Sequence, residues 1–280
     1  MVRQPALPLW QHVVFVDWHG VLSRAPFWGS VVTDPGHPLH RPLRARVGRL
    51  YGDPARMAAW MTGHHRTAEV VEALGVDGGA RYGTEYLCRQ LDKDCRVMRV
   101  NVELLRVLQT VRERAFVVVA TDNVDTFAAA FRRLSGRRDA RAVPAEEELP
   151  GTLAAWAPAM DDLVCSSDVG VLKGQDPDAF FGPYLAACGL GFADALLIDD
   201  RSENCAAFRR AGGTALRWTM HTDPLPELVA TLHAWLDGPP GAVPPLPGLP
   251  RQPVALQDAE AAGRAFRAAV PAAGSTRAKV

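Results

Sequence analysis

The sequence predicts an α/β fold, a Rossmann-like parallel sheet with helices on both faces. Short runs of β-branched and aromatic residues recur along the chain, as expected for strands that are buried on both sides. Amphipathic helical patterns alternate with these runs, as they do in βαβ units. Three of the runs end in polar residues, and such sheets bind their ligands beyond the carboxyl ends of the strands.

The expected strands follow from the continuous apolar runs at residues 13–16, 116–120 and 195–198. Two weaker runs, at residues 162–165 and 214–218, complete the sheet. Between them, apolar residues three and four apart predict helices at residues 103–114, 124–134, 178–188 and 202–211. Gly212 and Gly213 then end the last of these helices.

The chain divides into three regions. Residues 23–99 lack a clear buried strand and contain helical stretches at 54–61, 67–74 and 82–91, which predicts a small helical insertion after the first strand. Residues 8–22 and 100–237 then form the core. Residues 238–280 begin with a stretch rich in proline and glycine, which predicts a linker followed by a C-terminal segment with one amphipathic helix at 254–270.

Composition bounds the possible functions. The chain has 280 residues, of which 48% are hydrophobic, and 31 basic residues balance 31 acidic ones. This balance gives no reason to expect a nucleic-acid partner, and no apolar run approaches the roughly 18 residues of a membrane span. Five cysteines without a C-x-x-C pair favour free thiols. The N-terminal segment has no secretory pattern, so we expect a cytoplasmic protein.

Carboxylates follow two of the predicted strands. Asp17 follows the first strand, and by itself it could cap a turn as readily as take part in chemistry. Asp199 and Asp200 follow the strand at 195–198. Because adjacent carboxylates repel each other, this pair suggests a cation nearby.

Groups suited to an anion follow other strands. The hydroxyl of Thr121, beside Asp122 and Asn123, could hydrogen-bond an anion or could cap a helix. Lys173 is one of only three lysines in a chain whose other basic residues are all arginines. A lysine offers a phosphate a compact point charge that the planar guanidinium does not.

The order of these residues resembles the four motifs of the haloacid dehalogenase-like (HAD) hydrolase superfamily. The resemblance runs from about residue 13 to residue 218, and the segments S-S-D-V-G-V-L-K-G-Q-D-P and L-L-I-D-D-R-S-E-N are most similar to phosphatase members. It implies that the helical insertion is a lid over the site, of the type called a C1 cap. It also implies a magnesium-dependent phosphohydrolase that acts on a small phosphorylated metabolite.

The resemblance assigns a role to each candidate. Asp17 would be the nucleophile that forms an aspartyl-phosphate. Mg²⁺ would be held by Asp17, by Asp200 with Asp199 close by, and by the main-chain carbonyl of His19. Catalysis would also use Thr121 and Lys173, which would hold the phosphoryl oxygens together with Asp122 and Asn123.

The sequence departs from the phosphatase pattern at His19, where members of the family usually carry an acid/base aspartate. Three interpretations remain open. The imidazole, partly protonated near neutrality beside carboxylates, performs the acid–base work. Alternatively, the leaving group needs no strong acid, or the site is non-catalytic and only binds phosphate or a partner. A true dehalogenase is disfavoured because such members do not need magnesium.

Overall fold

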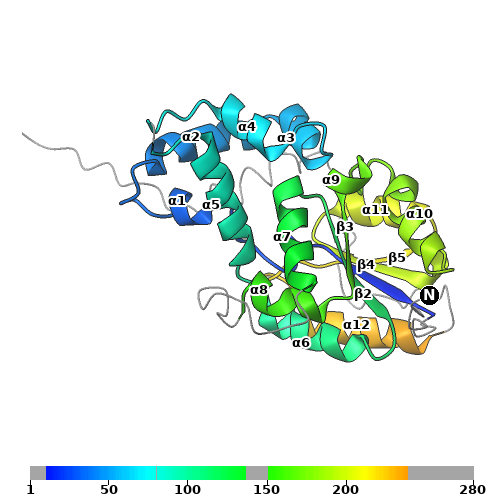
Figure 1. Ribbon diagram of the computed structural model, residues 1–280. Helices are drawn as coiled ribbons and strands as arrows, with labels where there is room; N and C mark the ends of the chain where they lie inside the picture. The colour runs from blue at the N-terminus through cyan, green and yellow to red at the C-terminus, as the bar shows by residue number, and fades with distance from the viewer. Residues whose placement is uncertain (1–10, 80, 137–150, 239–280) are drawn as a thin grey trace, which may run out of the picture.

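The computed structural model describes residues 11–79, 81–136 and 151–238. Its centre is a parallel five-stranded sheet with the strand order β3-β2-β1-β4-β5 (Figure 1). This sheet confirms the predicted fold class, and each strand lies where the apolar runs placed it. The strands are β1 (Val13–Val16), β2 (Phe116–Thr121), β3 (Asp162–Cys165), β4 (Ala195–Asp199) and β5 (Thr214–Arg217).

Helices connect the strands of this core. Four of them match the predicted helices to within three residues at each end, whereas α12 was not predicted as a separate element. The α-helices are α6 (Val102–Val111), α7 (Asp125–Ser135), α8 (Leu153–Trp156), α9 (Ser166–Val169), α10 (Pro177–Ala187), α11 (Ser202–Arg210) and α12 (Leu225–Asp237).

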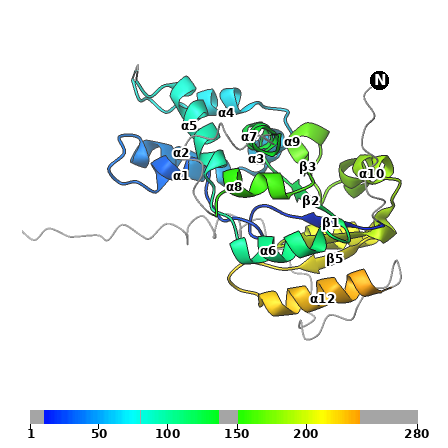
Figure 2. The same ribbon diagram turned by 60° about the horizontal axis from the view of Figure 1, so that its bottom comes forward.

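Alternate residues of each strand pack against helices on opposite faces of the sheet. Val14 and Val16 join a hydrophobic cluster with α6, α7 and α12. Val13 and Phe15 point the other way and pack with α10 and α11. Figure 2 shows α6 and α12 on one side of the sheet and α10 on the other. Burial on both faces explains why these strands are continuous apolar runs.

A helical insertion, with five helices among its described residues, separates β1 from α6. Helices α3 and α4 match the predicted stretches at 54–61 and 67–74, and α5 begins and ends later than predicted. The described part of residues 23–99 contains no strand of the sheet. The helices are α1 (Gly29–Val32), α2 (His40–Tyr51), α3 (Pro54–Met61), α4 (Thr67–Leu74) and α5 (Thr84–Arg96).

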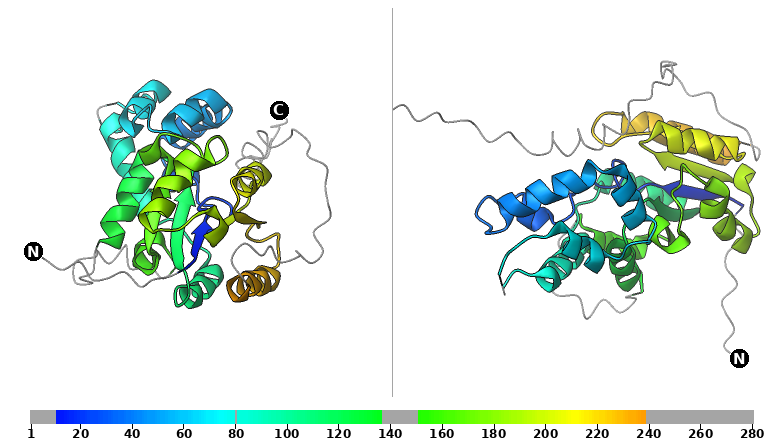
Figure 3. Two further views of the ribbon diagram at one scale, coloured as in Figure 1. Left: turned by 90° about the vertical axis from the view of Figure 1, so that its right-hand side faces the viewer. Right: turned by 90° about the horizontal axis from the view of Figure 1, so that it is seen from above.

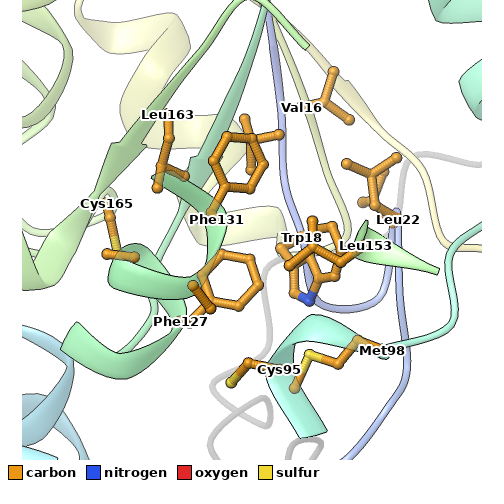
Figure 4. Close-up of a cluster of buried hydrophobic side chains, with 14 of the residues drawn as sticks. Val16, Trp18, Leu22, Cys95, Met98, Phe127, Phe131, Leu153, Leu163 and Cys165 are labelled. Carbon is orange, nitrogen blue, oxygen red and sulfur yellow. The ribbon is translucent and has the colours of Figure 1, made fainter. Parts of the chain in front are cut away.

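The insertion packs directly against the core. The indole of Trp18, just after β1, lies 4.9 Å from the ring of Phe127 on α7, between ring centroids. Cys95 of α5 and Met98 join the same buried cluster (Figure 4). The insertion occupies the end of the molecule opposite α6 and α12 (Figure 3). Its helices therefore share one continuous hydrophobic core with the sheet rather than standing apart.

Polar contacts reinforce this packing at the turn between α3 and α4. The main-chain N–H of Thr67 donates to Asp125 at the start of α7, over 3.2 Å. The hydroxyl of Ser166 donates to the carbonyl of Met61 over 2.6 Å. No helix among the described residues is long and apolar enough to cross a membrane. The predicted helix at 254–270 lies outside the described residues.

Candidate active site

The register of the sheet brings the first two carboxylates together. Val16 of β1 pairs with Ile198 of β4, so the next residues along each strand, Asp17 and Asp199, are neighbours at the carboxyl edge. The N–H of Asp17 donates to the carbonyl of Ile198 over 2.9 Å. Both carboxylates are buried, with exposed fractions of 5% for Asp17 and 0% for Asp199.

Lys173 lies between these two carboxylates. Its Nζ is 2.7 Å from Oδ1 of Asp17 and 2.6 Å from Oδ2 of Asp199. The same ammonium donates to the carbonyl of Ala120 over 3.0 Å, and the side chain is 1% exposed. Three acceptors therefore surround three N–H donors, which a compact ammonium satisfies and a planar guanidinium does not.

Asp200 completes a group of three carboxylates. One oxygen from each of Asp17, Asp199 and Asp200 lies within 4.8 Å of the others. Gly20 shapes the space beside them, since a Cβ there would lie 2.1 Å from Oδ2 of Asp200, and its φ of +88° also favours glycine. Carboxylate oxygens at this spacing are the hard ligands that Mg²⁺ prefers, so the residues present fit this ion.

Asp199 is held by groups that the sequence analysis did not identify. The side-chain amide of Asn204 donates to both of its carboxylate oxygens, over 3.1 Å each, and the N–H of Arg201 donates to Oδ1 over 2.9 Å. Asn204 lies five residues after Asp199, on the first turn of α11. Its position in the segment D-D-R-S-E-N, where a strand leads into a helix, was the signal that could have revealed it.

The last residue of β2 and the residues that follow it form the adjoining wall. Thr121 is fully buried, and its Oγ1 lies 3.5 Å from the amide nitrogen of Asn123. The N–H of Asn123 donates to the hydroxyl of Ser166 over 2.9 Å. The carboxylate of Asp122 accepts the N–H of Lys173 over 2.9 Å, so this side chain positions the lysine backbone. Ser166, which also contacts the insertion, was missed because its partners are distant in sequence.

Burial and mutual charge set the protonation of this group. Burial raises the pKa of Asp17 well above its usual range, and Asp199 and Asp200 add to this effect, while the Lys173 ammonium opposes it. Burial alone would lower the pKa of Lys173, but the neighbouring carboxylates outweigh it and raise that pKa. Burial and the charge of Asp199 raise the pKa of Asp200 to about 6. The lysine therefore stays charged, and the carboxylates lose their protons more easily when a cation is present.

His19 differs from the expectation made for it. Its side chain is accessible to solvent, yet desolvation by the surrounding protein lowers the pKa of the imidazole, as does the nearby charge of Arg24. Both effects, desolvation first, lower the protonated fraction of the imidazole near neutrality, whereas the sequence analysis expected neighbouring carboxylates to favour protonation. The main-chain carbonyl of His19 accepts no hydrogen bond from a described residue.

Comparisons with known proteins concern the fold. No family model and no curated protein matches the sequence. Among solved structures, a predicted HAD-like family hydrolase from Porphyromonas gingivalis is similar, with a TM-score of 0.53 and 16% identity over 79% of this chain and 97% of that one. A HAD family enzyme from Bacteroides thetaiotaomicron has a TM-score of 0.51 and 14% identity over 76% of this chain and 95% of that one.

A variant of the Bacteroides enzyme, solved in complex with magnesium and inorganic phosphate, has a TM-score of 0.50 and 13% identity over 76% of this chain and 96% of that one. These identities are low, whereas the coverage extends over nearly the whole of each similar structure. The overall fold is thus shared. The chain has the fold of the haloacid dehalogenase-like hydrolases.

Proposed function

We propose that the chain is a magnesium-dependent phosphohydrolase that acts on a small phosphorylated metabolite through an aspartyl-phosphate on Asp17. The observation that carries the proposal is the position of the Lys173 ammonium between Asp17 and Asp199, with Asp200 in the same group. A buried nucleophile, a fixed cation and a set of magnesium ligands are the components of phosphoryl transfer. The proposal includes a cytoplasmic location and assigns no nucleic-acid partner.

The hydrogen bonds of Asp17 identify its reactive oxygen. Oδ1 receives both the Lys173 ammonium, at 2.7 Å, and the N–H of Trp18, at 2.7 Å. Oδ2 accepts no hydrogen bond from the residues that the structure describes. We assign Oδ2 as the atom that attacks phosphorus, because its lone pairs remain free while Oδ1 fixes the orientation of the carboxylate.

The metal ligands follow from the contacts that are already made. Both oxygens of Asp199 are occupied by Lys173 and Asn204, which leaves Asp200 as the acidic ligand beside Asp17. The free carbonyl of His19 is the third candidate ligand. When bound, Mg²⁺ would offset the repulsion between the carboxylates and an anionic phosphate and would polarise the phosphoryl group.

The remaining residues act on the two ends of the reacting bond. We assign Lys173, with Thr121, Asp122 and Asn123 of the adjoining wall, to the phosphoryl oxygens; Asp122 would act through the lysine backbone, and Lys173 would exchange one of its present acceptors for a phosphoryl oxygen. As the P–O bond to the leaving group breaks, the imidazolium of His19 would give its proton to the leaving oxygen. Water would then release inorganic phosphate from Asp17, with the neutral imidazole accepting a proton.

The identity of His19 also supports a second candidate function. If the lowered pKa leaves the imidazole neutral at every working pH, the site would bind a phosphorylated ligand or partner without turning it over. The two functions share the same phosphate contacts and differ in turnover. The aspartyl-phosphate is therefore the decisive species.

A panel of phosphomonoesters assayed with and without Mg²⁺ tests the proposal, with Asp17→Asn as the diagnostic variant. The amide keeps the shape of Asp17 but is a far poorer nucleophile, so we expect turnover to be lost while the circular dichroism spectrum is unchanged. Asp178→Asn, on the exposed start of α10, is the matched control and should keep full activity.

Beryllium fluoride provides an independent readout, because it mimics an acyl phosphate on aspartate. We expect it to be trapped on Asp17 in the wild-type protein and not in Asp17→Asn. Near-normal turnover by Asp17→Asn would rule out the covalent route. Ligand binding without turnover in the wild type would establish the non-catalytic function instead.

A further inference from the structure

A pocket of about 820 Å³ is lined by none of the three carboxylates Asp17, Asp199 and Asp200. None of the catalytic or metal-binding candidates lines it. Its walls are the two linkers, the segments before α1 and after α5 that join the insertion to the core, and the loop between β5 and α12. These walls comprise residues 24–25, 99–103, 218 and 220–225.

Basic groups line this linker pocket. Arg24 comes from the first linker, Arg99 from the second, and His221 from the loop after β5. All three side chains are exposed, and neither arginine forms an ion pair with any residue that the structure describes. Unpaired guanidinium groups that converge on one space from separate segments are suited to bind a carboxylate or a phosphate.

Two helices also begin in the wall of the linker pocket. Asn101 is the N-cap of α6 and Pro224 is the N-cap of α12, and both line the pocket. The positive ends of these helix dipoles favour an anion, although Pro226 removes one N–H from the first turn of α12. Two carboxylates line the pocket as well. Asp223 already accepts the N–H of Thr219 over 2.7 Å.

The second carboxylate, Glu103, is exposed on the first turn of α6, where it also faces the positive end of that helix. A separate observation points to a missing acceptor. Trp218 lines the pocket and is 95% buried, with an exposed fraction of 5%, and its indole N–H has no hydrogen-bond partner among the described residues. A buried N–H without an acceptor is costly. The nitrogen is shielded from solvent, so an anionic oxygen would satisfy it once the pocket wall adjusts around the ligand.

We propose that the linker pocket is a binding site for a small anion that carries a carboxylate or phosphate group. Arg24 and Arg99 hold the anion from the two linkers, and the indole N–H of Trp218 donates to one of its oxygens. This site does not depend on the proposed phosphohydrolase activity.

A residue in the wall of the linker pocket is hydrogen-bonded to the loop that follows Asp17. The N–H of Met220, a lining residue, donates to the carbonyl of Gly20 over 2.8 Å. The hydroxyl of Ser23 donates to the carbonyl of Arg99 over 2.6 Å, which ties the two linkers together. An anion in the pocket therefore contacts both connections of the insertion and a loop that touches the candidate active site.

The test follows the indole N–H signals of the full-length protein in ¹⁵N-correlated NMR spectra, with the nitrogen of tryptophan labelled and Mg²⁺ withheld. Inorganic phosphate and succinate are the two probes, titrated separately to millimolar concentrations at constant ionic strength. The Trp218 signal is assigned by its absence from Trp218→Phe. We expect it to shift and saturate, because its proton gains an acceptor.

Internal and variant controls make the readout specific to this pocket. The indole N–H groups of Trp28 and Trp60 already donate to Leu87 and Thr67, so their signals should not move. The exposed arginines can be replaced without disturbing the core. Arg24→Ala and Arg99→Ala should each weaken binding about tenfold, the effect of one charged hydrogen bond. Arg106→Ala, an exposed arginine on α6 outside the pocket, should change it less than about twofold.

The two probes identify the chemistry of the ligand. A saturable shift with phosphate alone assigns the site to phosphorylated ligands, and a shift with succinate alone assigns it to carboxylates. A shift with both assigns it to either group. The absence of any saturable shift would overturn the proposal. A shift that persists with unchanged affinity in Arg24→Ala and Arg99→Ala would overturn it equally, because the anion would then bind elsewhere.

Discussion

Lys173 offsets the charge of the buried carboxylates in the candidate site. It is 1% exposed and contacts Asp17 and Asp199 at 2.7 and 2.6 Å. Removing one partner of a buried ion pair is more costly than the net contribution of the pair, because it leaves the other charge buried without compensation.

Lys173→Ala should therefore lower the free energy of unfolding of the metal-free protein by about 3–5 kcal/mol. Urea denaturation followed by circular dichroism measures the change. Arg41→Ala, an exposed position on α2, is the control and should stay within about 0.5 kcal/mol of the wild type. A loss for Lys173→Ala as small as that of the control would show that the carboxylates are protonated or solvated when the lysine is absent.

The acid–base role of His19 can be separated from a positioning role by the leaving group. His19→Ala should slow esters with poor leaving groups by about 10²–10⁴-fold and activated aryl phosphates much less. His19→Asp should recover part of the rate. Mg²⁺ affinity, measured alongside, should be unchanged because the expected ligand is the main-chain carbonyl. Equal losses for all leaving groups would remove His19 from acid catalysis.

The sign of the pKa shift predicts the pH profile of the same step. Because desolvation and Arg24 lower the pKa of His19, the acid form is populated below the usual value of about 6.5. The rate for poor leaving groups should fall as pH rises through this lowered pKa, on the acid side of about 6.5, and Arg24→Ala should move that fall to higher pH. Arg41→Ala should leave it in place.

Sequence reasoning identified the residues that form the Asp17 group because each one follows a strand of the sheet. Parallel strands end at one edge, so Asp17, Asp199 and Asp200 were expected to converge. Asn204 and Ser166 were not identified from the sequence, because their roles depend on partners that only the folded chain brings near. The assigned roles of Thr121, Asp122, Asn123 and Lys173 in phosphate binding remain predictions, as do the metal ligands.

Among the elements, the turn between α3 and α4 brings the main chain of the insertion close to that of α9 in the core. Gly63 in this turn has a φ of +72°, and a Cβ there would lie 2.4 Å from the main-chain carbonyl oxygen of Ser167. Gly75, after α4, has a similar φ of +58° but no atom within 4 Å of an added Cβ. The two glycines differ in contact and not in backbone conformation.

Gly75→Ala should cost about 1–2 kcal/mol of unfolding free energy, the strain of a positive φ. Gly63→Ala should cost more, because the main chain of α9 must also move away. Urea denaturation of both variants measures the difference, and faster hydrogen exchange in 61–67 should accompany the change in Gly63→Ala. Equal costs at the two positions would mean that the turn can move away from α9 without a loss of unfolding free energy.

The elements that the sequence did not reveal have physical reasons for being missed. Helix α2 contains Pro42 and Gly48, which disfavour helices, but Pro42 lies in the first turn, where its missing N–H has no partner to lose. Helix α12 has a pattern that was available, since Leu228, Leu232 and Trp235 recur at helical spacing. The strands were predictable because burial on both faces leaves little choice of residue.

At the scale of the whole molecule, the boundaries of the three regions remain predictions. The hydrophobic cluster that spans the insertion and the core shows that the insertion helices pack against the core. This packing gives the insertion a fixed place beside the site, which is a condition for its proposed role as a cap. The segment after α12 lies outside the described residues, and its role as a linker is untested.

The stability of the whole molecule should depend on pH in opposite ways with and without magnesium. The pKa of Asp200 is raised to about 6 and that of Asp17 is raised as well, so the folded protein holds these protons more tightly than the unfolded chain does. Without metal, stability should therefore fall as pH rises from the unfolded value near 4 through about 6. With magnesium, stability should instead rise with pH over this range, since the ion binds the deprotonated carboxylates.

We expect Mg²⁺ to raise the melting temperature more at about pH 7.5 than at about pH 5, because stabilisation grows with the ratio of ligand concentration to dissociation constant. Differential scanning calorimetry at both pH values, with Mg²⁺ and with EDTA, measures the increment. Asp200→Asn should remove most of it at the higher pH, whereas Asp178→Asn should keep it. The same increment at both pH values, or an undiminished one in Asp200→Asn, would show that the ion is held elsewhere, because only a carboxylate that must lose a proton in this range couples binding to pH in this way.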